Sequence, residues 1–279
     1  MSTVNRPRRL FCFGLGYSGR ALARELLAQG WRVAGTSRSA AGVAALAALG
    51  VEAFRFDELP EDALAGTSHL LSSVPPDAGG DPVLGRYRDR LAGALDWAGY
   101  LSTTGVYGDS GGDWVDEATV PAPSGERQAR RIAAERAWLE ALPAHIFRLA
   151  GIYGPGRSAV DQVRAGTAKR IDKPGQVFSR IHVDDISNVL IASFARPNPG
   201  AIYNVCDDLP AEPEAVVSEA CRLLGVAPPP LVPFDAAALS PMAASFWADN
   251  RRVRNRRIKA ELGVVLRHPD YRSGLAACL

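Results

Sequence analysis

The chain has 279 residues, of which 47% are hydrophobic, and its formal net charge is +2. This length and composition suffice for one large α/β domain, or for a nucleotide-binding domain with a smaller lobe. The near-balanced charge gives no general attraction to nucleic acids or membranes, and no apolar run approaches the roughly 20 residues that span a bilayer. Four scattered cysteines, with no Cys-x-x-Cys pair and no histidines at metal-ligand spacing, predict neither disulfides nor a metal site and favour the cytoplasm.

Short apolar runs alternate with helical patterns through the first half of the chain. The expected strands cover residues 10–13, 31–36, 51–56, 69–73, 99–102 and 145–149. Residues 21–29 and 40–49 carry apolar side chains at helical spacing, and a glycine follows each of these segments. Strands that alternate with helices are typical of βαβ units, so we expect an α/β fold with a doubly wound parallel sheet of the Rossmann type.

The composition of the sequence changes after about residue 150. Glycines and prolines become frequent there, and the regular alternation of strands and helices weakens. We therefore predict a dinucleotide-binding core over residues 1–150. The remainder, 151–279, is expected to form a smaller substrate lobe that interleaves with the last strands of the sheet.

A glycine-rich turn follows the first expected strand and precedes the first expected helix. Gly14, Gly16 and Gly19 form the pattern Gly-x-Gly-x-x-Gly, with Tyr17 and Ser18 between them. The first glycine allows a tight turn, the second lets the backbone approach a pyrophosphate, and the third lets helix and strand pack closely. The helix N-terminus also favours an anion. Glycines mark ordinary tight turns too, but the strand–turn–helix context favours a dinucleotide site.

The end of the second expected strand bears on which dinucleotide is bound. Sites for NAD usually place an acidic residue there, which binds the ribose 2′-hydroxyl. This chain has Ser37 and Arg38 instead, and a hydroxyl with a guanidinium suits a 2′-phosphate. We therefore expect NADP(H) rather than NAD(H). The alternative is that Arg38 is a solvated loop charge.

Four downstream segments, taken with the glycine-rich turn, resemble the extended short-chain dehydrogenase/reductases, in particular the NAD-dependent epimerase/dehydratase group. In chain order they are Leu-Ser-Thr-Thr-Gly-Val-Tyr-Gly at 101–108, Arg-Leu-Ala-Gly-Ile-Tyr-Gly-Pro-Gly at 148–156, Ser-Arg-Ile-His-Val-Asp-Asp at 179–185 and Ile-Tyr-Asn-Val at 202–205. The likeness covers nearly the whole chain. It implies that Asp57 meets the adenine and that Ser72, Ser73 and Val74 line the adenosine ribose.

The resemblance breaks at the catalytic pair of the family, Tyr-x-x-x-Lys. In the family the lysine lowers the pKa of the tyrosine, whose phenol exchanges a proton while hydride moves to or from the nicotinamide. Thr103 matches the Ser or Thr that completes the set, but alignment on Glu135 puts Arg127 at the tyrosine and Arg131 at the lysine. Arginine is a poor proton donor or acceptor at neutral pH. In this respect the chain resembles an atypical, sugar-epimerase-like branch of the superfamily, whose members keep the dinucleotide site and lack the Tyr-x-x-x-Lys dyad.

Thr103 and Tyr107 are the remaining candidate catalytic residues. The matching family tyrosine lies in the substrate pocket, but a phenol with an ordinary pKa of about 10 needs a nearby cation to act as an acid. Arg127 or Arg131 is a candidate for that cation. The alternative is that Tyr107 only packs at the pocket wall. His182 lies in a motif that positions the substrate lobe, so we interpret it as structural.

Two functions stay open. One is an NADP-dependent oxidoreductase or epimerase that acts on an unknown small molecule, such as a nucleotide-sugar-like compound. The other is a non-catalytic dinucleotide-binding or redox-sensing protein. The basic segment 251–259 favours a solvated amphipathic helix over a nucleic-acid patch, because Val253, Ile258 and Leu262 follow helical spacing and no aromatic residue is interleaved. We expect a monomer or homodimer, with neither nucleic acid nor membrane as partner.

Overall fold

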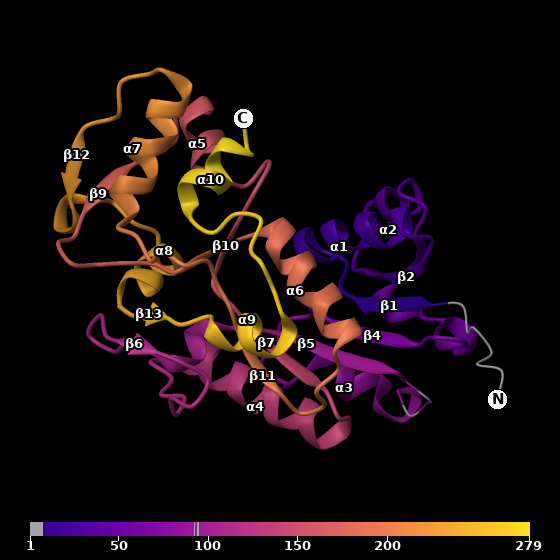
Figure 1. The fold of residues 1–279 in the computed structure, drawn as a ribbon. Helices are drawn as coiled ribbons and strands as arrows, with labels where there is room; N and C mark the ends of the chain where they lie inside the picture. Colours follow the sequence, from indigo (N-terminus) through magenta and orange to yellow (C-terminus); the bar gives the residue numbers. More distant parts are fainter. Residues whose placement is uncertain (1–7, 92, 94) are drawn as a thin grey trace. The chain divides into compact units, whose positions relative to one another are not determined.

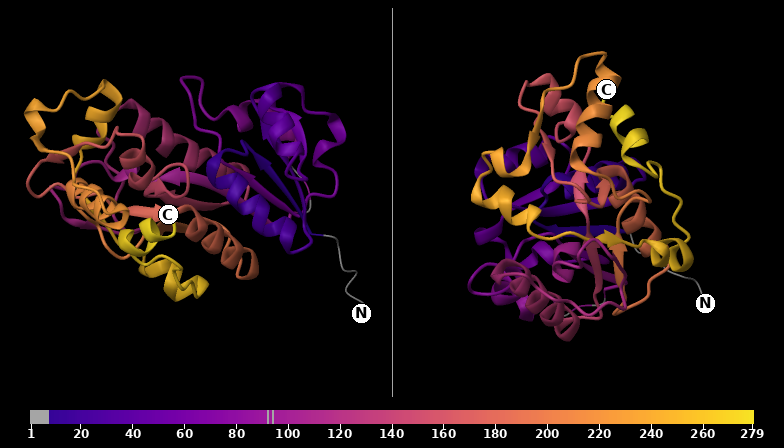
Figure 2. Two further views of the ribbon diagram at one scale, coloured as in Figure 1. Left: turned by 90° about the horizontal axis from the view of Figure 1, so that it is seen from above. Right: turned by 90° about the vertical axis from the view of Figure 1, so that its left-hand side faces the viewer.

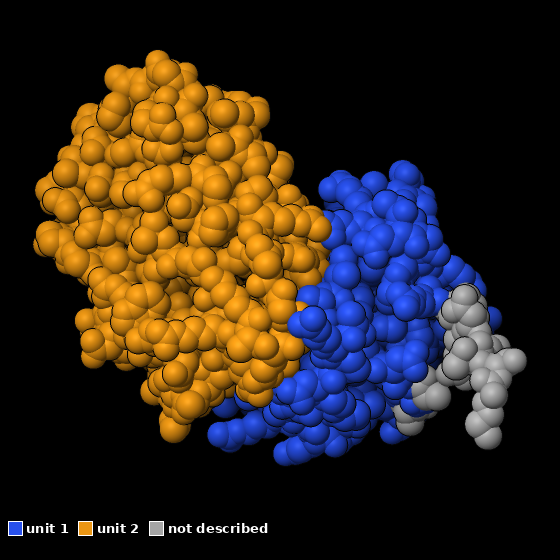
Figure 3. Space-filling model, in the orientation of Figure 1, with its two compact units in different colours: residues 1–102, 130–147, 190–202 blue, residues 103–129, 148–189, 203–279 orange. Residues whose placement is uncertain are grey.

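A computed structural model of the protein describes residues 8–91, 93 and 95–279. They form two compact units (Figure 3). The residue ranges show that the chain passes from one unit to the other several times. Unit 1 contains the chain up to residue 102, together with 130–147 and 190–202; unit 2 contains 103–129, 148–189 and 203–279. Each unit is therefore discontinuous in sequence. The predicted division of the chain into a core over residues 1–150 and a lobe over 151–279 stays a prediction. The two compact units have other bounds.

The main sheet has seven parallel strands in the order β11-β7-β5-β4-β1-β2-β3 (Figure 1). Their bounds are β1 (Arg9–Phe13), β2 (Arg32–Ser37), β3 (Glu52–Arg55), β4 (His69–Ser72), β5 (Trp97–Thr103), β7 (His145–Leu149) and β11 (Ile202–Val205). The chain builds outward from β1 to one edge and then from β4 to the other, which is the doubly wound arrangement. The predicted Rossmann-type sheet is confirmed, as are the strands expected in the first half of the chain.

Helices α1 and α2 pack beside the strands that they connect (Figures 1 and 2). The helices are α1 (Tyr17–Ala28), α2 (Ala40–Ala47), α3 (Pro82–Tyr87), α4 (Glu126–Ala141), α5 (Ala159–Arg164), α6 (Val183–Ala195), α7 (Pro213–Leu224), α8 (Pro241–Trp247), α9 (Arg256–Leu262) and α10 (Tyr271–Ala276). Both helices predicted in the first half are confirmed. The first begins earlier than expected, so that it leaves the glycine-rich turn directly.

Aromatic side chains fill the core of unit 1. Phe11 and Phe13 are fully buried, and their ring centroids lie 4.9 Å apart. Trp138 of α4 stacks on Tyr100 at 5.8 Å between centroids and donates its indole N–H to the Asp81 carboxylate at 2.9 Å. Trp138 is fully buried and anchors α4 to this core. The four cysteines are buried and free, as expected for a chain without a disulfide framework.

Unit 2 combines short parallel strand pairs with a helical cluster. The pairs are formed by β10 (Arg180–His182) with β8 (Gly151–Tyr153), β12 (Leu231–Pro233) with β9 (Arg170–Asp172), and β13 (Arg252–Val253) with β6 (Trp114–Val115). Side chains of α5, α7 and α10 share one buried core. Among the described residues, no helix is both long and apolar enough to cross a bilayer.

The basic segment after residue 250 is not one helix, which corrects the prediction in part. The backbone N–H groups of Arg252 and Arg254 donate to the carbonyls of Asp113 and Val115, at 3.0 and 2.9 Å, so this stretch pairs as a strand. The helix starts only at Arg256. The apolar face is confirmed, because Val253, Ile258 and Leu262 are all buried.

His69 makes the stability of unit 1 sensitive to acid. Its ring is buried against Trp31, Trp97 and Phe194, and burial lowers its pKa from 6.5 to about 4. Between these values the unfolded chain binds the proton and the folded chain does not, so stability falls as pH drops from about 6.5 to about 4. Denaturant unfolding at pH 7 and at pH 4.5 gives the free energy of unfolding at each pH. Between pH 7 and pH 4.5 this free energy should fall by about 2 kcal/mol less in His69→Phe than in the wild type. An unchanged loss would contradict this assignment.

Candidate functional site

The glycine-rich turn forms a backbone cradle at the carboxyl end of β1. Gly14 has a φ of 78°, and a Cβ added there would lie 3.0 Å from Val74 Cγ2 and 3.2 Å from Ser73 Oγ. The Gly16 N–H donates to the Gly14 carbonyl at 2.7 Å, and the Ser73 hydroxyl donates to the same carbonyl. Helix α1 begins at Tyr17 with no side-chain cap and no acidic residue in its first turn. This geometry suits an anion such as a pyrophosphate.

Strand β2 holds this turn in place through residues that the sequence reasoning missed. The Thr36 hydroxyl oxygen accepts the Gly14 N–H at 3.0 Å, and the Thr36 carbonyl accepts the Leu15 N–H at 3.0 Å. A Cβ on Gly35 would lie 2.4 Å from both the Cys12 carbonyl oxygen and the Leu15 side chain. Only glycine fits there. The one signal in the sequence was a glycine inside an apolar strand, which often marks a close backbone approach.

Ser37 and Arg38 lie where β2 passes into α2. The Ser39 hydroxyl caps α2 and accepts the Gly42 N–H at 3.1 Å. A Cβ on Gly42 would meet Ser37 Oγ at 2.0 Å, so this glycine allows the first turn of α2 to approach Ser37. Arg38 is exposed, and no residue in the described part of the chain pairs with its guanidinium. A hydroxyl, a guanidinium and a helix N-terminus therefore gather at this corner of unit 1.

The other predicted cofactor residues also belong to unit 1. Gly19 packs tightly in α1, because a Cβ there would lie 3.0 Å from Leu15 Cδ2. Ser18 is buried in the first turn of the same helix. Asp57 follows β3 in a short 3-10 turn, where its carboxylate lies 3.8 Å from the Arg86 guanidinium. The structure thus places Ser73 and Val74 directly against Gly14, and Asp57 after the neighbouring strand.

Thr103 ends β5 and caps the 3-10 turn Thr104–Tyr107. Its hydroxyl oxygen accepts the Gly105 N–H at 3.1 Å, and the side chain is half-buried. No acceptor among the described residues takes its O–H. A hydroxyl whose lone pair is engaged by the backbone keeps its proton for a further acceptor. Thr103 is therefore oriented as a hydrogen-bond donor.

Tyr107 belongs to a buried hydrogen-bond network of unit 2. Its side chain is 2% exposed, and its hydroxyl donates to Asn204 Oδ1 at 2.8 Å and accepts from Arg148 Nη1 at 3.0 Å. The Arg148 guanidinium also lies 4.9 Å above the ring. Burial raises the pKa of Tyr107, although Arg148 opposes the shift. A catalytic role for Tyr107 stays a prediction, and these contacts favour the packing alternative.

The two arginines that the sequence alignment predicts at the positions of the family's tyrosine and lysine contact aromatic rings. Arg131 donates to the Tyr100 hydroxyl and to the Leu101 carbonyl, both at 3.0 Å. Burial raises the pKa of Tyr100 to about 12 despite that cation. Arg127 lies 5.0 Å above the ring of Phe246. The register of α4 is fixed by Glu135, which accepts the Ser102 hydroxyl at 2.5 Å.

Tertiary folding assembles one cluster that the sequence reasoning excluded. His182, Asp184 and His268 place their possible metal-ligating atoms within 4.8 Å of one another. His182 is fully buried, which fits the structural interpretation but does not test it. Spacing along the chain could not reveal the cluster, because His268 lies far from the other two residues in sequence.

The charges of the basic segment pair within unit 2. Arg251 donates to the Gly108 carbonyl at 2.7 Å, and Arg257 pairs with Glu261 at 2.6 Å. The Arg254 guanidinium lies 4.9 Å above the ring of Trp114. Lys259 pairs with Asp208. These side chains therefore serve the packing of their own unit.

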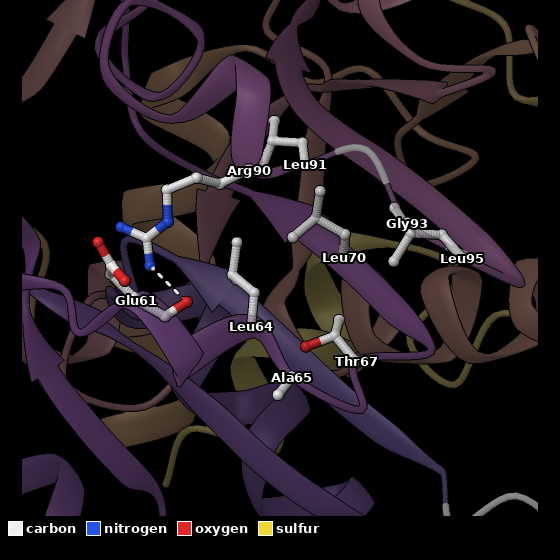
Figure 4. A pocket seen from close by; sticks show the side chains of 9 residues that line it. All are labelled: Glu61, Leu64, Ala65, Thr67, Leu70, Arg90, Leu91, Gly93 and Leu95. Carbon is white, nitrogen blue, oxygen red and sulfur yellow. Dashed lines mark hydrogen bonds between the residues drawn. The ribbon is translucent and has the colours of Figure 1, made fainter.

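Unit 1 also has a cavity of about 260 Å³ near the amino ends of β4 and β5 (Figure 4). It is lined by Glu61, Leu64, Ala65, Thr67, Leu70, Arg90, Leu91, Gly93 and Leu95. In a parallel sheet all the strands have their amino ends on one side and their carboxyl ends on the opposite side. The glycine-rich turn lies on the side of the carboxyl ends. None of the predicted site residues lines this cavity, which is therefore separate from the dinucleotide cradle.

Comparison with known proteins gives relatives along nearly the whole chain. A structure from Silicibacter pomeroyi DSS, of a conserved protein of unknown function, is 52% identical, with a TM-score of 0.91 over 97% of this chain and 98% of that chain. Protein YeeZ of Escherichia coli K12 is 29% identical over 242 residues, 80% of this chain and 86% of YeeZ. No protein-family model matches the chain.

Two further solved structures identify the fold. A Methylobacillus flagellatus protein named as an NAD-dependent epimerase/dehydratase is 28% identical, with a TM-score of 0.69 over 97% of this chain and 96% of that chain. A human epimerase family protein, solved with NADPH, is 18% identical, with a TM-score of 0.76 over 96% and 98%. The structural neighbours are members of the NAD-dependent epimerase/dehydratase group. This confirms the resemblance, and the chain has the epimerase/dehydratase fold.

Removal of the Tyr107 hydroxyl should destabilise the protein. In Tyr107→Phe the buried side chains of Arg148 and Asn204 each lose a partner, so we expect a loss of about 1–3 kcal/mol in the free energy of unfolding. Tyr153→Phe is the matched control, because its hydroxyl makes only a long contact of 3.4 Å to the Asp270 carbonyl. Denaturant unfolding gives the free energy of unfolding of both variants. An equal loss in the two would show that the hydrogen bonds of Tyr107 do not contribute more to stability than the long contact of Tyr153.

Proposed function

We propose that this protein binds NADP(H) on the turn between β1 and α1 and uses it in epimerase/dehydratase-type chemistry on a small, nucleotide-sugar-like compound. The observation that carries the proposal is the glycine-rich turn itself, where Gly14 packs against Ser73 and Val74. A Cβ on Gly16, in contrast, would meet no atom closer than 3.9 Å, so the backbone there is open to a pyrophosphate. The chain residues that border it fit a dinucleotide, since Ser73 and Val74 approach the turn closely and α1 presents an uncapped N-terminus. Neighbours of the same fold that carry NADPH or NAD support a nicotinamide dinucleotide.

The preference for NADP(H) rests on the corner between β2 and α2. No acidic residue stands at the end of β2, where an NAD site would bind the 2′-hydroxyl. Ser37 and the exposed Arg38 supply a hydroxyl and a planar cation instead. Gly42 keeps the N-terminus of α2 close to Ser37, which adds a partial positive charge. All three features favour a 2′-phosphate.

In this proposal Thr103 contacts the reacting oxygen of the substrate. The bound nicotinamide supplies the hydride chemistry. The Gly105 N–H orients the Thr103 hydroxyl so that its proton points to another acceptor, such as a carbonyl oxygen. Tyr107 stays the second predicted catalytic residue, but to donate its proton it must first give up the bond to Asn204.

A second function, a non-catalytic dinucleotide-binding or redox-sensing protein, is favoured by a specific observation. Proton transfer by a tyrosine needs a lowered pKa, yet burial raises the pKa of both Tyr100 and Tyr107. Arg131, at the position of the family lysine, already binds the Tyr100 hydroxyl. Such a protein would keep the cradle and report the redox state of the dinucleotide through its binding affinity.

Replacement of Arg38 should weaken NADPH binding selectively. Loss of a charge-assisted contact to the 2′-phosphate is worth about 1.5–3 kcal/mol, so Arg38→Ala should bind NADPH roughly 10- to 100-fold more weakly and NADH unchanged. Calorimetric titration with NADPH, NADP, NADH and NAD measures this. Arg32→Ala, at the exposed start of the same strand, is the control and should bind normally. Equal weakening for NADH would refute the phosphate contact, and no binding to any of the four would refute the cofactor site.

Turnover separates the two functions. In a screen of nucleotide sugars in which substrate and product are separated by chromatography, Thr103→Ala should lower kcat roughly 100-fold at unchanged NADPH affinity, because a donor to the reacting oxygen is lost. Thr103→Ser retains the hydroxyl and should recover much of the rate. Turnover unaffected by Thr103→Ala would rule out the role of Thr103. A marked difference in affinity between NADPH and NADP, with no turnover of any compound, would instead support the sensing function.

A further inference from the structure

Three metal-ligating side chains converge in unit 2, apart from the residues assigned to the dinucleotide. His182 ends β10, Asp184 lies in the first turn of α6, and His268 precedes α10. Asp184 Oδ2 lies 3.5 Å from His182 Nδ1 and 3.7 Å from His268 Nε2. The two imidazole rings lie 4.0 Å apart between centroids. Two nitrogen atoms and one carboxylate oxygen thus face a common centre.

The spacing of these atoms fits a zinc ion. Bonds of about 2.0–2.1 Å in a tetrahedral site place neighbouring ligand atoms about 3.3 Å apart. The two nitrogen–oxygen distances exceed this value by only a few tenths of an ångström. The three ligand atoms all lie within 4.8 Å of one another, so side-chain rotations that draw the two nitrogen atoms together would complete the set. Imidazole nitrogens with a carboxylate suit zinc, whereas calcium and magnesium prefer an all-oxygen set.

Hydrogen bonds hold the segment of His268 against α6 without any metal. Asp185 is fully buried, and its carboxylate accepts the backbone N–H groups of Arg267 and His268 at 2.7 and 2.9 Å. Asn188, one turn further along α6, donates to the Val265 carbonyl at 2.8 Å. The ligands are thus brought together in advance, which lowers the conformational cost of binding an ion.

His182 is also oriented as a ligand. Its Nδ1 accepts the Asp184 N–H only at a long 3.3 Å, which puts the proton on Nε2, and a zinc ion at Nδ1 would replace this weak hydrogen bond. Nε2 faces the Cys278 sulfur at 3.9 Å, and that thiol donates to the Gly274 carbonyl at 3.2 Å. A histidine that binds a metal commonly donates its other N–H to an outer partner. The sulfur is in that position.

We propose that His182, Asp184 and His268 form a zinc-binding site that joins the end of β10 and the start of α6 to the segment before α10. The site is open on one side, because the Asp184 side chain is 44% exposed, whereas that of His182 is 1% exposed. An ion enters past Asp184 and His268, and the fourth position is left to water. The inference is independent of the proposed dinucleotide chemistry.

Zinc content and affinity test the proposal directly. The protein, purified without a histidine tag and stripped with a chelator, is dialysed against zinc chloride and analysed for metal. We expect one zinc ion per chain, and a rise in melting temperature of about 5 °C at a hundredfold excess over the dissociation constant. Zinc content that stays far below one per chain would overturn the proposal.

Variants at the two partly exposed ligands show whether this cluster binds the ion. Asp184→Asn and His268→Gln should each weaken zinc binding at least tenfold in calorimetric titration and abolish the rise in melting temperature. Asp62→Asn removes an exposed carboxylate of unit 1 and should leave zinc binding unchanged. Cys278→Ala should also retain zinc. Binding that survives both ligand substitutions, or that is lost in Cys278→Ala alone, would place the ion elsewhere. An unchanged far-UV circular dichroism spectrum in each variant confirms that the fold is intact.

Discussion

The carboxyl end of β1 is held from both sides at the point where the chain turns into α1. On one side Thr36 of β2 bonds to Gly14, and on the other Ser73, after β4, donates to the carbonyl of the same residue. These contacts need the backbones to approach more closely than any Cβ at Gly14 or Gly35 would allow. The conformation of the glycine-rich turn, where we propose that the dinucleotide binds, is therefore a consequence of strand packing that depends on the absence of side chains.

The contacts of two arginine side chains bear on which residues can transfer a proton. Arg131, which the sequence predicts at the position of the family lysine, binds the Tyr100 hydroxyl and the Leu101 carbonyl. Arg148 is committed in the same way to Tyr107. Burial outweighs both cations, so the pKa of each phenol is raised. The partly exposed Thr103 hydroxyl, whose proton no described residue accepts, is therefore the donor that we propose for a substrate.

Unit 2 uses its polar residues largely to join distant parts of the chain. Asp185 connects α6 to the backbone before α10, and Arg251 reaches the Gly108 carbonyl across more than a hundred residues. The cluster of His182 and His268 lies on one of these connections. A metal ion there would further stabilise the contact between α6 and the segment before α10, which hydrogen bonds already hold together.

Local patterns in the sequence determined the strands, the first helices and the glycine-rich turn, because each depends on neighbours a few residues apart. The family motifs and the serine and arginine after β2 belong to the same class of signal. Only the tertiary structure decided that Gly35 packs against Leu15, that Tyr107 meets Asn204, and that His268 reaches Asp184. Such contacts join residues far apart in the chain, and their geometry is set by the packing of whole elements, which no short window of sequence contains.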